Sequence, residues 1–480
     1  MSGRAAAALA ILAVGLATVR CSHAPRSTCT TFLESPQLRP CAPARAKLAT
    51  PMFHGDRARL GWNAAETILT PSLVGSSRFG ATWSSPPFDD AQLDDGVSRP
   101  HMYASPLYVD GVTISGGDHG GRALSIVVAA TSNAWVYAVN AFTDCSATPT
   151  VDAGTILWRT RLGTPKRVEM DGRMPLGVLS TPVIDLEAIP PRLYVVSVDA
   201  TIGFQAFALD LASGAVLVGW PVTIDDPALR PINVNGPALF AASGVVSQRG
   251  ALALSPKGDR LYVPFGAYND GGTGWLVSID TRRAALASAF SMAPWSEPSA
   301  NGGMWGAGGP AIDANGVVYG TTGNSPDASA NAPATWGNSL LAFAPGDPLA
   351  LAGAYSPWNR CLLDAADIDI GAGSPMIVPD LDPAATSTPH LVAFGGKQGN
   401  VYLVDRDRLA PRTQRTACTS DSASDLSLLP PAIQPPLGAR GPLNVFGPSI
   451  EEAHRRRVRC IDDGTVFVGT DRIQAFAVVE

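Results

Sequence analysis

Charged residues are scarce in this 480-residue sequence, in which Asp, Glu, Lys and Arg together make up 16%, against about a quarter in average globular proteins. The formal net charge is −6, so there is no general electrostatic reason for binding nucleic acid and no such partner is expected. Hydrophobic residues reach 46%. That proportion provides enough apolar surface to exclude an intrinsically disordered chain.

Several catalytic and metal-binding patterns are absent as well. The sequence contains no H-E-x-x-H, no G-x-S-x-G, no Walker phosphate loop and no EF-hand loop, which excludes the protein classes that those patterns mark. The 48 Gly and 41 Pro residues follow no three-residue period, so a collagen helix is excluded too. They favour many short strands joined by tight turns.

Long hydrophobic runs are missing except near the start. Arg4 precedes an uncharged apolar run from Ala5 to Thr18, which is short for a membrane span and typical of a secretory signal. We therefore expect residues 1–20 to be a signal peptide and residues 21–57 an exported N-terminal linker, with no membrane span. The protein is expected in the periplasm or outside the cell. A lipid anchor at Cys21 is not favoured, because Arg20 precedes it.

The seven cysteines form no C-x-x-C pair, which excludes zinc-ribbon, thioredoxin-like and c-type haem motifs. Export would permit disulfides. Cys29 with Cys41 and Cys418 with Cys460 are possible pairs, and buried free thiols are an equally open alternative.

A repeated pattern runs through the rest of the chain. Six copies of an aromatic or apolar residue, a small residue and another apolar residue, usually before Asp or Asn, are spaced by 61 to 74 residues. The copies are Tyr137–Asn140, Phe207–Asp210, Val277–Asp280, Leu341–Phe343, Tyr402–Asp405 and Phe476–Val478. Repetition at such a period indicates stacked copies of one small structural unit.

Each copy follows a second predicted strand, and most are also preceded by a strand that small residues and Pro introduce. The second strands are Ile126–Ala130, Arg192–Val198, Arg260–Phe265, Val317–Thr322, Leu391–Gly395 and Thr465–Thr470. Outer strands are expected at 155–159 and 215–217. The sequence therefore predicts an all-β fold, a β-propeller of four-stranded antiparallel blades over residues 58–480. A sandwich would not repeat six times at this period, and a solenoid would have shorter repeats.

We expect about seven blades, with six and eight open. The strand candidate Gly80–Trp83 could complete the last blade and close the ring. The segment Pro411–Pro448, rich in Pro, Ser and Leu, is expected to be a long loop or an eroded blade.

The repeat resembles the pyrroloquinoline-quinone (PQQ) repeat. The run Ala104–Gly111, followed by Val136–Val139 and Ile156–Trp158, is similar to one such repeat almost throughout, and the resemblance covers about Arg59 to Glu480. It implies the quinoprotein fold, which occurs in PQQ-dependent dehydrogenases and in non-catalytic relatives such as the outer-membrane assembly lipoproteins. Function does not follow from the fold alone.

Two stretches are similar to the dehydrogenases. Gly302–Gly306 contains Trp305, at the position where the family places a tryptophan beneath the planar quinone. Val318–Asn324 ends in Asn324, which by the same resemblance would supply a Ca²⁺ ligand beside the cofactor. The implied cofactors are PQQ and Ca²⁺, or none. The alternative is that Trp305 is a packing residue between blades and Asn324 a turn residue.

Other positions depart from the family pattern. Asn338 stands where the dehydrogenases have an Asp general base, and an amide cannot accept a proton at neutral pH. The Glu of the Ca²⁺ shell and the adjacent-cysteine disulfide have no counterpart. Asp367 and Asp369, which alternate on one face of an extended segment, are the candidate substitutes as proton acceptor or cation ligands. They could equally belong to a solvated loop.

These departures favour an exported binding or interaction protein with a degenerate quinone site, whose partner is a small molecule or a protein at the propeller mouth. The alternative is a PQQ- and Ca²⁺-dependent alcohol or sugar dehydrogenase with a remodelled base. If the site exists, Trp305, Asn324 and Asp367 should converge at one mouth, and an ionised side chain over Trp305 would favour the enzyme.

Overall fold

The computed structural model describes residues 48–409, except for 65, 67–68, 168–174, 241–245, 269–270, 295–301, 326–334, 358–359 and 398, together with the strands at 444–446 and 474–478. The chain divides into two units, Met1–Pro40 and Cys41–Glu480. All described residues belong to the second unit. None of its described helices is long and apolar enough to span a bilayer.

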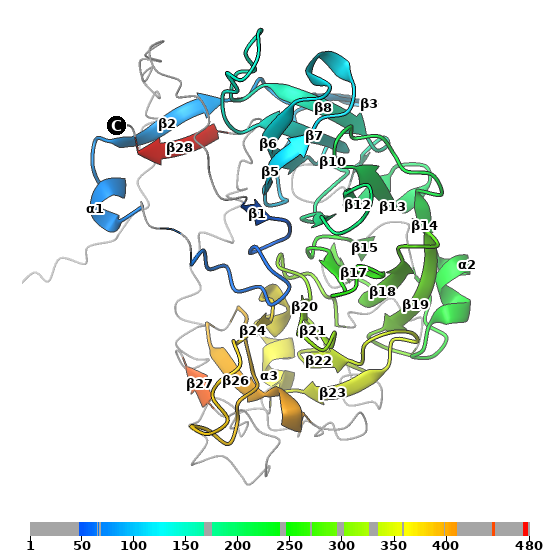
Figure 1. Ribbon diagram of the computed structural model, residues 1–480. Helices are drawn as coiled ribbons and strands as arrows, with labels where there is room; N and C mark the ends of the chain where they lie inside the picture. Colours follow the sequence, from blue (N-terminus) through cyan, green and yellow to red (C-terminus); the bar gives the residue numbers. More distant parts are fainter. Residues whose placement is uncertain are drawn as a thin grey trace, which may run out of the picture. The chain divides into compact units, whose positions relative to one another are not determined.

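Antiparallel strands are the main regular element of the described structure, and five sheets follow one another along the chain (Figure 1). The first sheet contains β1 (Ala49–Thr50), β5 (Leu107–Thr113), β6 (Ala123–Ala130), β7 (Trp135–Asn140) and β8 (Ile156–Arg161). The second contains β11 (Val183–Asp185), β12 (Arg192–Asp199), β13 (Gly203–Asp210) and β14 (Val222–Ile224). The third contains β15 (Val246–Ser247), β16 (Ala253–Leu254), β17 (Arg260–Ala267), β18 (Trp275–Asp280) and β19 (Ala285–Ser291).

The fourth and fifth sheets have the same plan. The fourth contains β20 (Ala311–Ile312), β21 (Val318–Thr321), β22 (Leu340–Phe343) and β23 (Leu351–Tyr355), and the fifth β24 (Met376–Ile377), β25 (Leu391–Gly395), β26 (Val401–Asp405) and β27 (Asn444–Phe446). Three two-stranded pairs join β2 (Phe79–Ser84) to β28 (Gln474–Val478), β3 (Ala91–Leu93) to β4 (Gly96–Ser98), and β9 (Lys166–Arg167) to β10 (Pro175–Leu176). A four-stranded antiparallel meander, as predicted for the repeats, is present in each of these five sheets, and the first and third sheets contain a fifth strand as well.

Helices are few and short. Those within the described residues are α1 (Pro71–Val74), α2 (Asp226–Leu229), α3 (Arg360–Ala365) and the 3-10 turns η1 (Gly117–His119), η2 (Arg230–Ile232), η5 (Ile370–Ala372) and η6 (Arg406–Arg408).

The Asp that ends a repeat motif closes the turn after the third strand. The Oδ1 atom of Asp210 accepts hydrogen bonds from the backbone N–H groups of Ala212 and Ser213, at 2.8 and 3.0 Å. Asp280 does the same for Arg282 and Arg283, at 2.9 and 3.0 Å. A short acidic side chain is favoured there because it satisfies backbone donors that no strand partner reaches.

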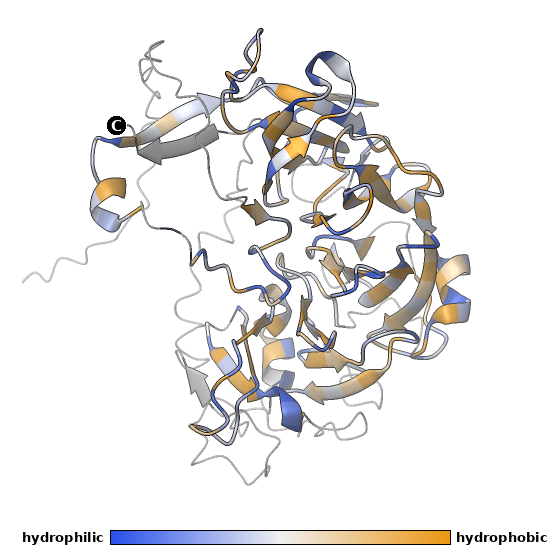
Figure 2. Cartoon of the chain, in the orientation of Figure 1, coloured by the Kyte–Doolittle hydropathy of each residue, from blue (hydrophilic) through white to orange (hydrophobic). Residues whose placement is uncertain are grey.

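The second, third and fourth sheets each bury one face against the sheet before them and the other face against the sheet after them. In β12, Leu193 and Val195 pack with the first sheet, whereas Tyr194 and Val196 pack with the third. The same alternation continues through β18 and β22 to the fifth sheet. Apolar residues are accordingly frequent along these strands, which contain much orange in Figure 2. This is the arrangement expected of propeller blades, whose two faces are covered by neighbouring sheets.

The N-terminal segment (residues 48–60) contacts the inner strand of all five sheets. β1 pairs with β5, and the backbone then bonds to β11 through Pro51 and Ile184, at 2.7 Å. Further along, Arg57 accepts from Ile312 of β20, at 2.8 Å, and Ala58 from Ile377 of β24, at 2.9 Å. Residues 48–57, which we expected in a linker, therefore take part in the packing of the sheets.

Arg59 fixes this segment to the third and fourth sheets. Its side chain is 2% exposed and donates to the carbonyl oxygens of Leu252, at 2.8 Å, Pro310, at 3.1 Å, and Phe53, at 3.1 Å. Burial lowers the pKa of Arg59 to about 10. Three hydrogen bonds thus offset the cost of removing this cation from water.

The structure also tests the predicted ends of the repeat. The strand expected at 80–83 lies within β2, which pairs with β28 of the last repeat (Figure 1). Of the segment 411–448, the strand β27 is described, and it pairs with β26. The predicted strand at 465–470 lies outside the described residues. Each described sheet is open, and the number of blades stays a prediction.

The outer strand of the second repeat was predicted in the wrong place. Within residues 215–217 the structure forms an isolated bridge between Val216 and Leu209, and the regular strand is β14, at Val222–Ile224. Gly219 has a φ of 88°, and the backbone N–H of Trp220 donates to the carbonyl oxygen of Leu217, at 3.1 Å. The chain therefore turns between the bridge and the strand, which a pattern of apolar residues does not reveal.

One cysteine is assigned by the structure. Cys145 is disulfide-bonded. The two pairs suggested from the sequence involve cysteines that lie outside the described residues.

Candidate functional site

The candidate site is built on connections between strands of the fourth and fifth sheets. Trp305 precedes β20, and Asn324 follows the end of β21. Asp367 and Asp369 lie between α3 and η5, just before β24, and Lys397 lies between β25 and β26. These connecting segments are far apart in sequence, but they meet because the two sheets that they belong to are neighbours.

Trp305 is partly buried and is held at its edge by a carboxylate. Its Nε1–H donates to Oδ2 of Asp369, at 3.0 Å, and Asp369 is 1% exposed. A Cβ atom on Gly323 would lie 2.6 Å from this Asp369 oxygen and 2.8 Å from Trp305 Nε1. The hydrogen bond between the ring and the carboxylate therefore requires a glycine at position 323.

Two cations lie near the face of the Trp305 ring. The Lys397 ammonium nitrogen is 5.3 Å from the ring centre, and the Arg249 guanidinium carbon is 5.8 Å from it. Both residues are exposed to solvent. Cations at this distance from an indole are attracted to its π electrons, and together they create a positive environment around a flat aromatic ring.

Lys397 links the two aspartates that the sequence singled out. Its ammonium nitrogen lies 2.7 Å from Oδ1 of Asp367 and 2.9 Å from Oδ1 of Asp369. Its backbone N–H also donates to the carbonyl oxygen of Asp369, at 3.0 Å. Burial alone would lower the pKa of Lys397, but the charge of Asp369 and hydrogen bonds to both carboxylates outweigh it and raise this pKa above its ordinary value.

Asn324 joins the same network from the fourth sheet. Its Nδ2 donates to Oδ1 of Asp367, at 2.9 Å, and its Oδ1 accepts from Nδ2 of Asn338, at 3.1 Å. Asn338 also donates to Oδ1 of Asp364, at 2.6 Å, and accepts from the backbone N–H of Ile370, at 2.9 Å. The network therefore runs without interruption from Asp364 to Trp305.

Asn338 orders the loops of this site. It is 0% exposed and uses both ends of its amide in the hydrogen bonds described above. An Asp at this position would bring a second carboxylate to hydrogen-bonding distance of Asp364, and the donor to Asn324 would be lost. Asn338 and Asp367 also have φ angles of 43° and 52°, in the left-handed region that Asn and Asp tolerate better than most residues. Such backbone conformations concentrate at functional sites.

The structure brings all four sequence-predicted residues together: Trp305, Asn324, Asp367 and Asp369. Asp369 contacts Trp305, and Asp367 contacts Asn324. The residues that sequence reasoning missed are Lys397, Arg249, Asn338 as an organising residue, and Asp364 as its acceptor. Of these, only Lys397 had a local signal, since Gly395 and Gly396 precede it directly after a strand and allow a close approach of the backbone.

The donor set does not fit the expected Ca²⁺. Calcium takes six to eight oxygen ligands, but the two aspartate oxygens that would begin such a shell face the Lys397 ammonium, and the Asn324 oxygen faces the Asn338 amide. Within the part of the chain that the structure describes, no group of three or more His, Cys, Asp or Glu side chains is placed to hold a metal ion. The protein's own cation lies where the metal was expected.

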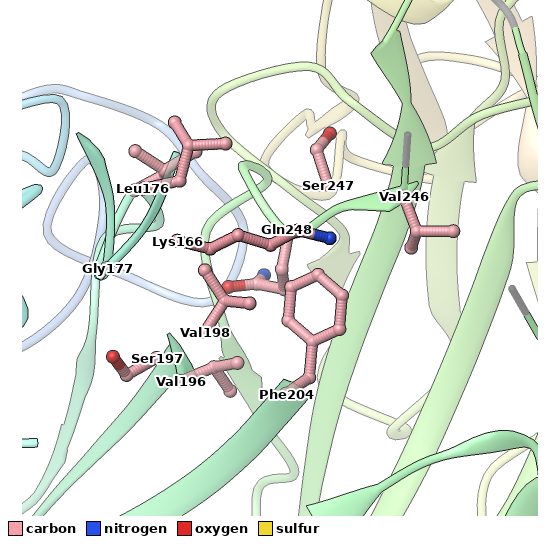
Figure 3. Close-up of a pocket in the computed structure, with 11 residues that line it drawn as sticks. Lys166, Leu176, Gly177, Val196, Ser197, Val198, Phe204, Val246, Ser247 and Gln248 are labelled. Atoms are coloured by element: carbon pink, nitrogen blue, oxygen red, sulfur yellow. The ribbon is translucent and has the colours of Figure 1, made fainter. Parts of the chain in front are cut away.

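A small cavity lies between the second and third sheets (Figure 3). Lys166 reaches across it toward Gln248, the residue before Arg249. Burial lowers the pKa of Lys166. The cavity contains none of the sequence-predicted site residues.

Comparison with known proteins finds no matching family profile and no matching curated protein. Among solved structures, the chain is similar to the quinohemoprotein alcohol dehydrogenase of Comamonas testosteroni, with 15% identity, a TM-score of 0.47, and coverage of 75% of this chain and 48% of that one. A europium-containing methanol dehydrogenase gives 17% identity, a TM-score of 0.48, and coverage of 76% and 57%. The periplasmic gluconolactonase of Pseudomonas aeruginosa gives 12% identity, a TM-score of 0.31, and coverage of 74% of this chain and 77% of that one.

The chain thus spans about half the length of the first two proteins. At these identities and TM-scores, similarity to these structures assigns no activity, cofactor or metal to this chain.

Proposed function

We propose that this protein is an exported β-propeller of about seven blades that binds a planar, negatively charged aromatic ligand of the quinone type on Trp305. The observation that carries the proposal is the partly exposed indole with two cations, Lys397 and Arg249, within 6 Å of its centre. A flat anion gains from both parts of this surface, through stacking and through charge.

PQQ is the probe that suits this surface, because it is a planar fused-ring quinone bearing three carboxylates. Trp305 would hold its ring, and Lys397 and Arg249 would pair with its carboxylates or carbonyl oxygens. Bound PQQ would supply a two-electron acceptor. The ordered contact of Trp305 with Asp369 keeps the indole in one orientation, so little side-chain freedom would be lost on binding.

The hydrogen bonding and burial of the site's polar groups favour binding without turnover over catalysis. Asn338 cannot take a proton, and its buried hydrogen bonds support an ordering role. Asp369 is engaged by Trp305 and Lys397 and is 1% exposed. General-base assistance contributes about 10²–10⁴-fold to a rate, and neither residue is suited to provide it.

Dehydrogenation of an alcohol or sugar is the second candidate, and Asp367 is the observation in its favour. Its side chain is 61% exposed and carries a carboxylate beside the Lys397 ammonium. The cations near Trp305 also meet the condition of an ionised group over the ring, although a cation does not accept a proton. In this function Asp367 would take the hydroxyl proton of the substrate.

Export is supported by the disulfide at Cys145, because disulfides persist in oxidising compartments. The signal peptide at residues 1–20, a linker that follows it and ends before residue 48, and a propeller that includes residues 48–57 together with 58–480 are part of the proposal.

Titration calorimetry with PQQ tests the binding function. The wild type should bind PQQ saturably, Trp305→Ala should lose at least about tenfold in affinity, and Trp62→Ala should bind as the wild type does, because Trp62 is 74% exposed and plays no part in the site. Absence of saturable binding to the wild type would refute the proposal.

A dye-linked assay of the PQQ-loaded protein with alcohols and sugars separates the two candidates. Turnover that Asp367→Asn abolishes, while PQQ affinity is kept, would replace the binding function by the dehydrogenase.

A further inference from the structure

The space between Asp367 and Asp369 is filled by a cation that belongs to the chain. Lys397 lies 2.7 Å from one carboxylate and 2.9 Å from the other. The side chains of Lys397 and Asp367 are 36% and 61% exposed, whereas that of Asp369 is 1% exposed. The ammonium therefore bridges a buried carboxylate and an exposed one.

Backbone packing fixes Lys397 in this position. Its N–H bonds to the Asp369 carbonyl, at 3.0 Å, and a Cβ atom on the preceding Gly396 would lie 2.5 Å from that same oxygen and 2.4 Å from the Cα of Ile370. The β25–β26 connection is thus pressed against the aspartate segment through a glycine. Side-chain and backbone contacts hold Lys397 to the same residue.

Neutral N–H groups also donate hydrogen bonds to the two carboxylates. Trp305 donates to Oδ2 of Asp369 and Asn324 donates to Oδ1 of Asp367, so each carboxylate accepts from one N–H group as well as from the ammonium. A divalent ion placed among these oxygens would lie within a few ångströms of Lys397. At such a distance two cations repel strongly in a partly buried site.

We propose that the Lys397 ammonium is the resident cation of this site, that the site takes its planar anionic ligand without a divalent metal, and that removing the ammonium would turn the aspartate pair into a cation site. The ligand part of this statement rests on the proposed function. The statement about the Lys397 ammonium and the aspartate pair does not rest on it, because it involves only residues of this chain and a metal ion.

Terbium(III), a luminescent stand-in for Ca²⁺, tests the cation part without any quinone. Excited tryptophan transfers energy to a nearby Tb³⁺ ion, and Trp305 contacts Asp369 directly. The wild type should give no saturable Tb³⁺ emission that Ca²⁺ displaces. Lys397→Ala should gain such emission, and Lys397→Arg should behave as the wild type does.

Two double variants test whether the Tb³⁺ emission comes from an ion bound at the aspartate pair beside Trp305. Lys397→Ala with Asp367→Asn should lose Tb³⁺ binding, and Lys397→Ala with Trp305→Phe should keep binding, measured by calorimetry, but lose most of the emission. If Lys397→Ala does not fold, Lys397→Gln takes its place, since it keeps the length of the side chain and removes the charge.

Three results would overturn the inference: Ca²⁺-displaceable Tb³⁺ emission in the wild type that Asp367→Asn removes, a folded Lys397→Ala and Lys397→Gln that both fail to bind Tb³⁺, or PQQ binding to the wild type that EDTA abolishes. If PQQ does not bind at all, the proposed function fails while the Tb³⁺ measurements still decide the role of Lys397.

Discussion

Gly323 is the position at which a single methyl group should break the site. In Gly323→Ala the new Cβ atom would lie 2.6 Å from Asp369 Oδ2 and 2.8 Å from Trp305 Nε1, between the two partners of a 3.0 Å hydrogen bond. Neither partner has room to retreat easily, because Lys397 holds the other oxygen of Asp369 and Gly266 packs against Trp305.

The expected cost combines two terms. A hydrogen bond to a charged group contributes about 1.5–3 kcal/mol, and overpacking costs about 1–3 kcal/mol. Together these contributions give about 2.5–6 kcal/mol. Since the atoms that must shift are ends of side chains, we expect the lower part of this range, a loss of about 2.5–3.5 kcal/mol in the free energy of unfolding. PQQ affinity should fall at least about tenfold, because the indole can no longer keep its orientation.

Denaturant unfolding followed by fluorescence measures the first effect, and titration calorimetry the second. Gly80→Ala is the matched control: it also adds one methyl group, but no atom lies within 4 Å of the new Cβ, and its unfolding free energy should stay within about 1 kcal/mol of the wild type. If Gly323→Ala unfolds as the wild type does, the contact between Trp305 and Asp369 does not hold this site together.

Three further predictions concern the framework. Arg59→Met should lower the free energy of unfolding by about 3 kcal/mol or more, because buried carbonyls lose their donor, whereas Arg283→Met, whose side chain is 83% exposed, should change it by less than about 0.5 kcal/mol; equal effects in denaturant unfolding would contradict the buried role of Arg59. Arg406→Met should cost about 3–5 kcal/mol in the same assay, because it leaves Asp313, which is 3% exposed and 2.7 Å away, as an unpaired buried charge. Asp199→Asn tests acid stability: burial raises the pKa of Asp199, but hydrogen bonds from Thr201, Thr164 and Ile202 outweigh it and lower this pKa to about 2. Because the folded pKa lies below the unfolded one, the wild type should exceed Asp199→Asn by about 2 kcal/mol above about pH 4 and lose that advantage as the pH falls toward 2; a difference that does not depend on pH would contradict the assignment.

The inner part of each sheet could be predicted from the sequence because two physical constraints act on it. Residues such as Leu193 and Tyr194 are both buried, on opposite faces, so the second strand is mostly apolar. The Asp at position 210 or 280 is required by the turn that follows. These signals are local, and they recur whenever the unit recurs.

The outer and axial parts could not be predicted in the same way. The second repeat's outer strand is displaced by the turn around Gly219. The third repeat lacks the small-residue and Pro introduction of the others, so β15 and β16 were not foreseen. The N-terminal segment looked like a linker, because many of its contacts are backbone hydrogen bonds to strands more than fifty residues away, for which side-chain patterns carry no information, and a single Arg such as Arg59 gives no sign that it will be buried.

For the site, a resemblance supplied Trp305, Asn324 and the two aspartates, and the structure brings them together. It could not supply Lys397. A single lysine after two glycines is common in turns, and its meaning depends on which carboxylates the neighbouring sheet presents. Its presence also explains why the expected Ca²⁺ does not fit, which no count of acidic residues would have indicated.

The pairing of β2 with β28 has a consequence for the order in which the molecule is made. Residues 79–84 leave the ribosome nearly four hundred residues before residues 474–478, their partners in one sheet. Until those residues have been synthesised, β2 has an unpaired edge that is open to strands of other molecules. Premature termination upstream of residue 474 should therefore yield aggregates rather than a smaller soluble protein.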